Sequence, residues 1–107
     1  MRSARFNVYV ICLADAILER RRFREANPQY IAGMPCVYVG MTGWTPEKRF
    51  EAHLNGYKSS SYVTRYGCEL LPRKYEHLNP MTYDEAVREE KLLADRLRRE
   101  GYAVWQK

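Results

Sequence analysis

The segment Tyr83–Glu100 constrains the fold most, because its apolar residues recur at the spacing of a single helix face. Thr82 followed by Glu85 is typical of a capping box at a helix start, and Gly101 is typical of a helix end. A helix of this length needs a second layer on which to bury its apolar stripe. The residues predicted to form the stripe are Tyr83, Ala86, Val87, Leu93, Ala94 and Leu97.

Glu90 lies inside this stripe, one turn after Ala86 and one turn before Ala94, whereas Glu89 lies at its edge and can reach water. A carboxylate that faces the interior is rare unless it is paired with a cation or holds a metal ion. Two interpretations follow: Glu90 is either half of a buried ion pair with an arginine or a metal ligand.

Two tyrosine-centred apolar segments predict neighbouring strands of one sheet. Phe6–Leu13 and Cys36–Met41 are short and rich in β-branched and aromatic residues, and both contain the tripeptide VYV. Cys68–Leu71 and Lys74–His77 are weaker strand candidates, and Tyr102–Trp105 is expected to be a strand or a packed tail.

Further helices are indicated by start and stop signals. Pro46–Asn55 follows a hydroxyl N-cap at Thr45 and precedes a glycine, which predicts a helix. Ala14–Glu25 predicts a helix with only a partial apolar stripe, which ends before Asn27-Pro28. Gly56–Gly67 is expected to be a polar, basic connection.

The helix after Thr45 carries two pairs of residues four positions apart. Phe50 and Leu54 are expected to form its contact with the core. Arg49 and His53 share the same spacing on an adjacent face. This places a guanidinium and an imidazole side by side at the edge of the buried surface.

The order of these elements predicts an α/β domain in which helices flank a small central sheet of mixed or antiparallel strands. With 107 residues the chain can build one modest core, so we expect a single domain, 1–107. No run of 18 apolar residues exists, so we expect no membrane span and a cytoplasmic location. Three widely spaced cysteines, Cys12, Cys36 and Cys68, fit no zinc pattern and are expected to be reduced and mostly buried.

The net charge of +5 arises outside the long helix. Nine tyrosines are interleaved with the basic residues, a combination that suits a polyanion with stackable bases. Trp44 and Trp105 are expected to serve in packing rather than in base stacking. The basic residues concerned are Arg20–Arg22, Arg24, Lys48, Arg49, Lys58, Arg65, Arg73 and Lys74.

The ordered set of Tyr9, Tyr38-Val39-Gly40, Arg49 with His53, and Glu90 resembles the GIY-YIG nuclease family of small DNA-cleaving domains. Asn7-Val8-Tyr9 stands where the first family motif would be and keeps its tyrosine. Tyr38-Val39-Gly40 matches the second motif with valine in place of isoleucine. The resemblance covers Asn7 to about Ala94, which is most of the chain.

The resemblance implies an endonuclease that hydrolyses DNA phosphodiester bonds with Mg²⁺, for which Mn²⁺ would substitute, and that selects DNA structure or has weak sequence preference. Glu90 would bind the metal and Arg49 would stabilise charge on the phosphate. Tyr9, Tyr38 and His53 would handle water and phosphate. The implied catalytic residues are Tyr9, Tyr38, Arg49, His53 and Glu90, and the implied nucleic-acid contacts are Gly40, Lys48, Lys58 and Arg65.

Two other functions compete with a nuclease. The first is a non-catalytic nucleic-acid-binding module with the same fold, and the second is a protein-interaction domain in which Glu90 and Arg49 form a structural pair. RNA stays open as a substrate, and so does the oligomeric state, a monomer included.

Residues 13–35 are expected to form an insertion between the two motif strands, because 28 residues separate Tyr9 from Tyr38 and the family usually has a much shorter link. This segment could contact DNA, mediate self-association or cover part of the sheet.

Overall fold

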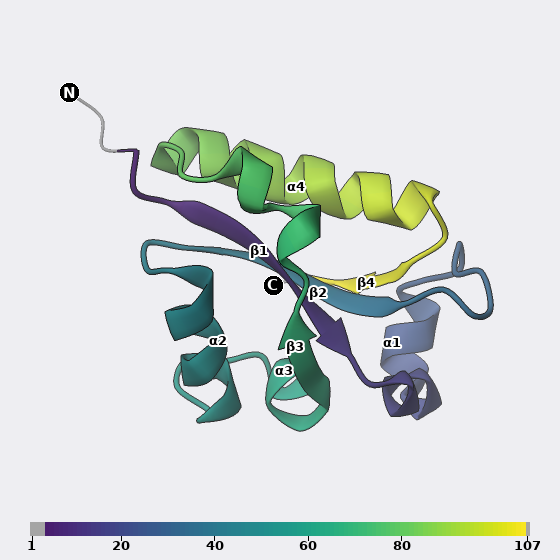
Figure 1. The fold of residues 1–107 in the computed structure, drawn as a ribbon. Helices are drawn as coiled ribbons and strands as arrows, with labels where there is room; N and C mark the ends of the chain where they lie inside the picture. Colours follow the sequence, from purple (N-terminus) through teal and green to yellow (C-terminus); the bar gives the residue numbers. More distant parts are fainter. Residues whose placement is uncertain (1–3, 107) are drawn as a thin grey trace.

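The computed structural model describes residues 4–106, so the outermost residues of the predicted domain 1–107 lie outside the described part. Four strands form one mixed sheet in the order β3-β1-β2-β4, with α4 on one side and α2 and α3 on the other (Figure 1). The predicted α/β architecture is therefore confirmed. The strands are β1 (Asn7–Leu13), β2 (Cys36–Thr42), β3 (Gly67–Leu70) and β4 (Ala103–Trp105).

Strand pairing leaves one edge of the sheet partly open. The predicted neighbours β1 and β2 pair antiparallel along their whole length, with Tyr9 opposite Gly40. Strand β3 pairs antiparallel with β1, whereas β4 runs parallel to β2 and pairs only with Cys36–Tyr38. Among the described strands, none pairs with the remaining edge of β2, residues 39–42. The predicted strand at Lys74–His77 is wrong, because 3₁₀ turns occupy Pro72–Lys74 and Glu76–Leu78.

Helix α4 (Tyr83–Arg99) begins at the predicted capping box, in which the Thr82 hydroxyl accepts from the Glu85 backbone and the Glu85 carboxylate accepts from the Thr82 backbone. Its buried residues are Ala86, Leu93, Ala94 and Leu97. Tyr83 and Val87 are 55% and 45% exposed, so the predicted stripe is wrong at these two positions. The reason is that β4 lies below only the C-terminal half of α4 (Figure 1).

Helix α2 (Pro46–Leu54) has the predicted Thr45 N-cap, whose hydroxyl accepts from the Lys48 backbone. Its predicted core contact is wrong at Leu54, which is exposed, while Phe50 is half-buried. The buried residue of α2 is instead His53. The segment predicted as a connection contains a short helix, α3 (Ser61–Tyr66), because Val63 packs into the core.

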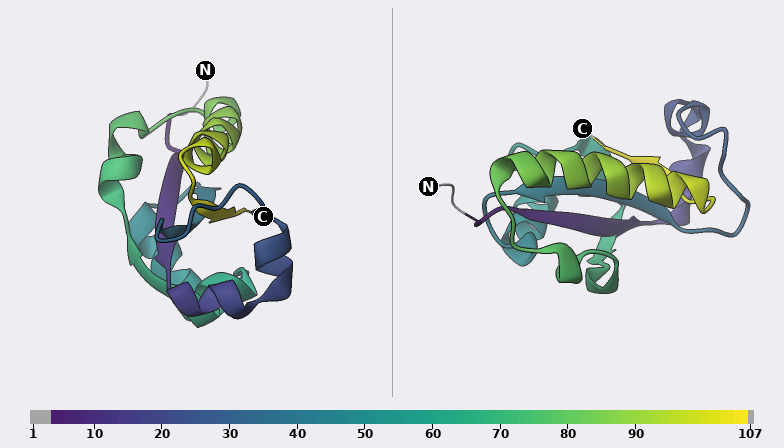
Figure 2. Two further views of the ribbon diagram at one scale, coloured as in Figure 1. Left: turned by 90° about the vertical axis from the view of Figure 1, so that its right-hand side faces the viewer. Right: turned by 90° about the horizontal axis from the view of Figure 1, so that it is seen from above.

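The insertion covers one end of the sheet rather than standing apart from it (Figure 2). It forms a 3₁₀ helix, η1 (Asp15–Glu19), and a short helix, α1 (Arg21–Glu25), instead of the single helix predicted for Ala14–Glu25. Ile17 and Phe23 are fully buried in the core. The structure therefore supports the role of a cover among the three that the sequence left open.

Two composition-based expectations can be compared with the structure. Within residues 4–106, no helix is long and apolar enough to cross a membrane. The three cysteines carry free thiols, but only Cys36 is buried, whereas Cys12 is half-buried and Cys68 is exposed. The prediction of mostly buried cysteines is therefore wrong for Cys68, which lies on the short strand β3.

Candidate active site

Tyr9, Tyr38 and His53 form a buried cluster between the sheet and α2. Strand alternation places Tyr38 and Gly40 on the same face of β2, and Gly40 lies opposite Tyr9 on β1. The hydroxyl Oη of Tyr9 lies 2.8 Å from Nε2 of His53. The Tyr38 ring meets the His53 imidazole edge-on, with centroids 5.4 Å apart. The fold thus brings together three residues that are far apart in the sequence.

Gly40 makes room for the Tyr9 ring. A Cβ atom at this position would lie 2.6 Å from both Cζ and Oη of Tyr9 and 3.0 Å from Cε1 of Tyr38. Gly40 is itself buried beneath these rings. The sequence-based role for Gly40 was close approach to nucleic acid, whereas the structure shows close approach to Tyr9.

Burial and nearby charges set the protonation of this cluster. Burial raises the pKa of Tyr9, an effect to which the neighbouring Tyr38 adds and which the Arg49 guanidinium opposes. The pKa of Tyr38 is also raised, first by burial and then by the charge of Glu90. Burial, helped by the positive charge of Arg49, lowers the pKa of His53 to about 4. At neutral pH the cluster therefore holds a neutral imidazole and two neutral phenols.

Among the described residues, the Tyr9 hydroxyl is the hydrogen-bond partner of the His53 side chain. Its second ring nitrogen, Nδ1, is buried and has no hydrogen-bond partner among the residues that the structure describes. A buried nitrogen without a partner costs free energy, which a site tolerates where the group has a further role. The neutral Nε2 is placed to accept a proton from the Tyr9 hydroxyl or to donate one to it.

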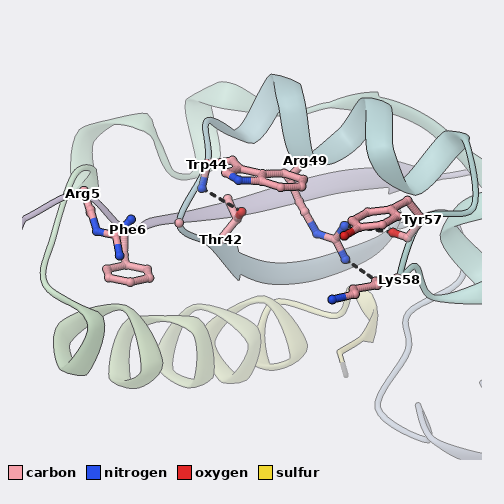
Figure 3. Close-up of a pocket in the computed structure, with 8 residues that line it drawn as sticks. Arg5, Phe6, Thr42, Trp44, Arg49, Tyr57 and Lys58 are labelled. Carbon is pink, nitrogen blue, oxygen red and sulfur yellow. Dashed lines mark hydrogen bonds between the residues drawn. The ribbon is translucent and has the colours of Figure 1, made fainter.

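Arg49 extends from α2 into a surface pocket of about 340 Å³ (Figure 3). Its guanidinium donates from Nη1 to the carbonyl of Tyr57, at 3.1 Å, and from Nη2 to the carbonyl of Lys58, at 2.6 Å. The same side chain lies close enough to Tyr9, Tyr38 and His53 to shift the pKa of each. Arg49 therefore connects the buried cluster to a solvent-accessible pocket.

Glu90 is half-buried rather than enclosed, so the prediction that it faces the interior is only partly correct. Its carboxylate raises the pKa of both Tyr9 and Tyr38, which places it near the cluster. The described residues contain no group of three or more His, Cys, Asp or Glu able to hold a metal. One carboxylate fits Mg²⁺, which binds through one or two carboxylates and substrate phosphates and keeps several waters. The donor set does not fit zinc.

The three basic residues predicted to contact nucleic acid separate into two groups. Lys58 lines the pocket with Arg49, and Lys48 lies over the Trp44 ring, with its Nζ 5.4 Å from the ring centroid. Arg65 is exposed on α3 and lies over the Tyr66 ring instead of lining the pocket.

The sequence reasoning missed six residues of the pocket, which are Arg5, Phe6, Thr42, Gly43, Trp44 and Tyr57. The prediction that Trp44 serves in packing is wrong, because Trp44 is 41% exposed. Trp105 does pack, against Phe23 and Tyr62. The signal for Trp44 was its place in the short turn between a strand and a helix cap, where a large apolar side chain has little core to join.

Comparison of this chain with known protein families, with curated sequences and with solved structures finds no match.

Proposed function

We propose that this protein is a metal-dependent nuclease of the GIY-YIG kind that hydrolyses phosphodiester bonds in DNA. The observation that carries the proposal is that Tyr9, His53 and Glu90 gather beside Arg49, the one of these four residues that also lines the surface pocket. These residues come from three different elements, and each supplies a group that phosphodiester hydrolysis needs.

Charge stabilisation would fall to Arg49. The reaction adds negative charge to the non-bridging phosphate oxygens, and a guanidinium stays protonated at any physiological pH. Two backbone carbonyls already hold the guanidinium of Arg49, so it needs little reorganisation when a phosphate arrives. Glu90 would hold Mg²⁺, which when bound supplies Lewis-acid charge neutralisation at the phosphate.

Proton transfer would fall to the contact between Tyr9 and His53. An isolated tyrosine is a poor base at neutral pH, and burial makes Tyr9 poorer still by raising its pKa. A neutral imidazole at 2.8 Å gives the phenolic proton an acceptor as the Tyr9 oxygen takes one from the attacking water. Because the pKa of His53 is lowered to about 4, this transfer requires the negative charge of a bound phosphate to raise the pKa of the imidazole again. Tyr38 packs against the imidazole in a T-shaped contact and would help to orient it.

The test compares the wild type with Glu90→Gln and, as a matched control, Glu89→Gln, the adjacent half-buried glutamate on α4. Each protein is incubated with Mg²⁺, Mn²⁺ or EDTA and with single-stranded, duplex, flapped and branched DNA or RNA. We expect metal-dependent cleavage that Glu90→Gln abolishes and Glu89→Gln retains. Cleavage that continues in EDTA, or at full rate in Glu90→Gln, would overturn the proposal.

A second candidate is a nucleic-acid-binding module without useful turnover. The observation that favours it is the burial of both phenols: the Tyr9 and Tyr38 side chains are only 2% and 3% exposed, which limits their access to a substrate. This candidate expects salt-sensitive binding in EDTA and no cleavage by the folded wild type at enzyme excess.

A further inference from the structure

Trp44 and Tyr57 form an exposed aromatic pair beside Arg49. Their rings stack with centroids 6.2 Å apart and an angle of 17° between the planes. Both residues are exposed, by 41% and 52%, whereas Tyr9, Phe23 and Tyr38 are buried in the core. Two stacked rings at the wall of a pocket are an apolar surface that a ligand can cover (Figure 3).

The backbone around this pair is fixed without help from the rings. The Trp44 carbonyl accepts from Asn7 Nδ2 at 2.8 Å, and the Trp44 amide donates to Thr42 Oγ1 at 3.0 Å. The Tyr57 carbonyl accepts from Arg49, and its amide donates to the Ala52 carbonyl at 2.9 Å. Because the main chain is already held in place, the two rings are not needed to hold the loops and are preorganised for binding.

Cations surround the aromatic pair. The ammonium groups of Lys48 and Lys58 lie over the rings of Trp44 and Tyr57, with Nζ 5.4 and 5.6 Å from the ring centroids. A base that stacks on either ring would therefore take the place of a lysine, whose ammonium could then meet a phosphate. Arg5 and Arg49 line the same pocket. Positive charge beside stacked aromatic rings matches the two parts of a nucleotide, an anionic phosphate and a flat base.

We propose that the Trp44–Tyr57 pair binds one unpaired nucleobase of the strand whose phosphate lies at Arg49. The inference rests on the proposed function in so far as the ligand is a nucleic acid, and it adds that the substrate is single-stranded or locally unpaired. Within a duplex both faces of a base are covered by its neighbours, so only an unstacked base can cover these rings. A volume of about 340 Å³ is at the small end of ligand pockets, which suits one nucleotide and not a duplex.

The test uses the intrinsic fluorescence of tryptophan in EDTA, where binding is measured without cleavage. The chain has two tryptophans, Trp44 and the half-buried Trp105. We expect single-stranded DNA or RNA of the same sequence to quench the fluorescence of the wild type, and blunt duplex to quench it far less. In Trp44→Phe, which keeps a ring and leaves only Trp105, the quenching should disappear while the affinity from anisotropy stays within a few-fold.

Substitution then measures the contribution of the rings. Trp44→Ala and Tyr57→Ala should each weaken the Kd for single strands by roughly fivefold to 150-fold, the range found for loss of one base–aromatic stack, and leave the Kd for blunt duplex nearly unchanged. Leu92→Ala, at an exposed apolar side chain of α4, is the control and should change neither.

Saturated binding of a single strand without a change in Trp44 fluorescence would overturn the inference, as would equal losses for single strands and duplex in Trp44→Ala. These outcomes are separate from those for the nuclease. A protein that cleaves DNA but shows no Trp44 signal loses only the stacking site, and one that shows the signal without cleavage loses only the catalytic proposal.

Discussion

A methyl group added at position 40 has no room, since the Tyr9 ring occupies that space. We predict that Gly40→Ala displaces the ring, breaks the contact between Tyr9 and His53, and lowers the free energy of unfolding by about 1–3 kcal/mol, as overpacking does. Urea denaturation measures the loss. Gly43→Ala is the control, because its nearest neighbour is a Phe6 ring carbon at 3.3 Å, and it should cost much less. Equal losses for the two variants would contradict the role given to Gly40.

The depressed pKa of His53 makes stability depend on pH. Its ordinary value is 6.5, and burial lowers the pKa to about 4 in the folded protein. Between pH 6.5 and pH 4 the unfolded chain therefore binds more protons, so stability is full above pH 6.5 and falls as the pH drops towards 4. The slope from this residue is at most about 1.4 kcal/mol per pH unit.

The measurement is urea denaturation of the wild type, His53→Gln and His77→Gln across this pH range. His53→Gln should reduce the slope, because glutamine does not titrate, whereas the exposed His77 serves as the matched control and should leave it unchanged. The same slope in the wild type and His53→Gln would show that the imidazole titrates near its ordinary value.

At the scale of the elements, the sequence predicted what depends on local signals. The capping boundary at Thr82, the N-cap at Thr45 and the pairing of the two VYV strands are all confirmed, because caps and short periodic runs are encoded by neighbouring residues. The sequence could not predict which side of α2 faces the sheet. His53 is buried there instead of Leu54, since the Tyr9 hydroxyl offers its imidazole a hydrogen bond.

The candidate site also depends on contacts between elements, which local signals do not encode. The Tyr9 contact with His53 joins residues 44 positions apart, and the approach of Glu90 to both tyrosines depends on how α4 packs against the sheet. Neither contact can be derived from hydrophobic periodicity. Periodicity indicates which face of one helix or strand is buried, but it does not show which other element packs on that face. The pocket residues Trp44 and Tyr57 were missed for this reason, because they belong to two loops that only the tertiary structure brings together.

The insertion, residues 13–35, is predicted to contribute to the stability of the hydrophobic core. Phe23 is fully buried. Its ring makes a T-shaped contact with Tyr62, with centroids 5.9 Å apart, and lies with its centroid 6.2 Å from that of Trp105. Phe23→Ala should lower the free energy of unfolding by about 3–5 kcal/mol, as other buried phenylalanines do. Arg22→Ala, on the exposed side of α1, should stay within about 0.5 kcal/mol of the wild type. A small loss for Phe23→Ala would mean that the insertion can detach from the sheet.

Over the whole molecule, the net charge of +5 arises outside the segment that forms α4, since residues 83–100 carry five basic and six acidic residues. Lys91 on α4 is paired with Asp95 at 2.8 Å, which compensates its charge locally. Lys58, in contrast, lies at the pocket with Arg49 and points its ammonium over the Tyr57 ring. A polyanion is therefore expected to approach from the side of the pocket, which Arg5, Arg49 and Lys58 line.

Salt dependence distinguishes this arrangement from a uniformly basic surface. Each lysine that neutralises a phosphate releases a condensed counterion, so log Kd changes with log salt by about 0.7 units of slope per contact with a single strand. We predict that Lys58→Ala lowers the slope by about 0.7 for single-stranded DNA in EDTA, measured by anisotropy between about 50 and 200 mM salt. Lys91→Ala removes the same charge from the far side and should leave the slope unchanged. If both variants lower the slope equally, net charge alone drives binding, and the pocket has no special part in holding the strand.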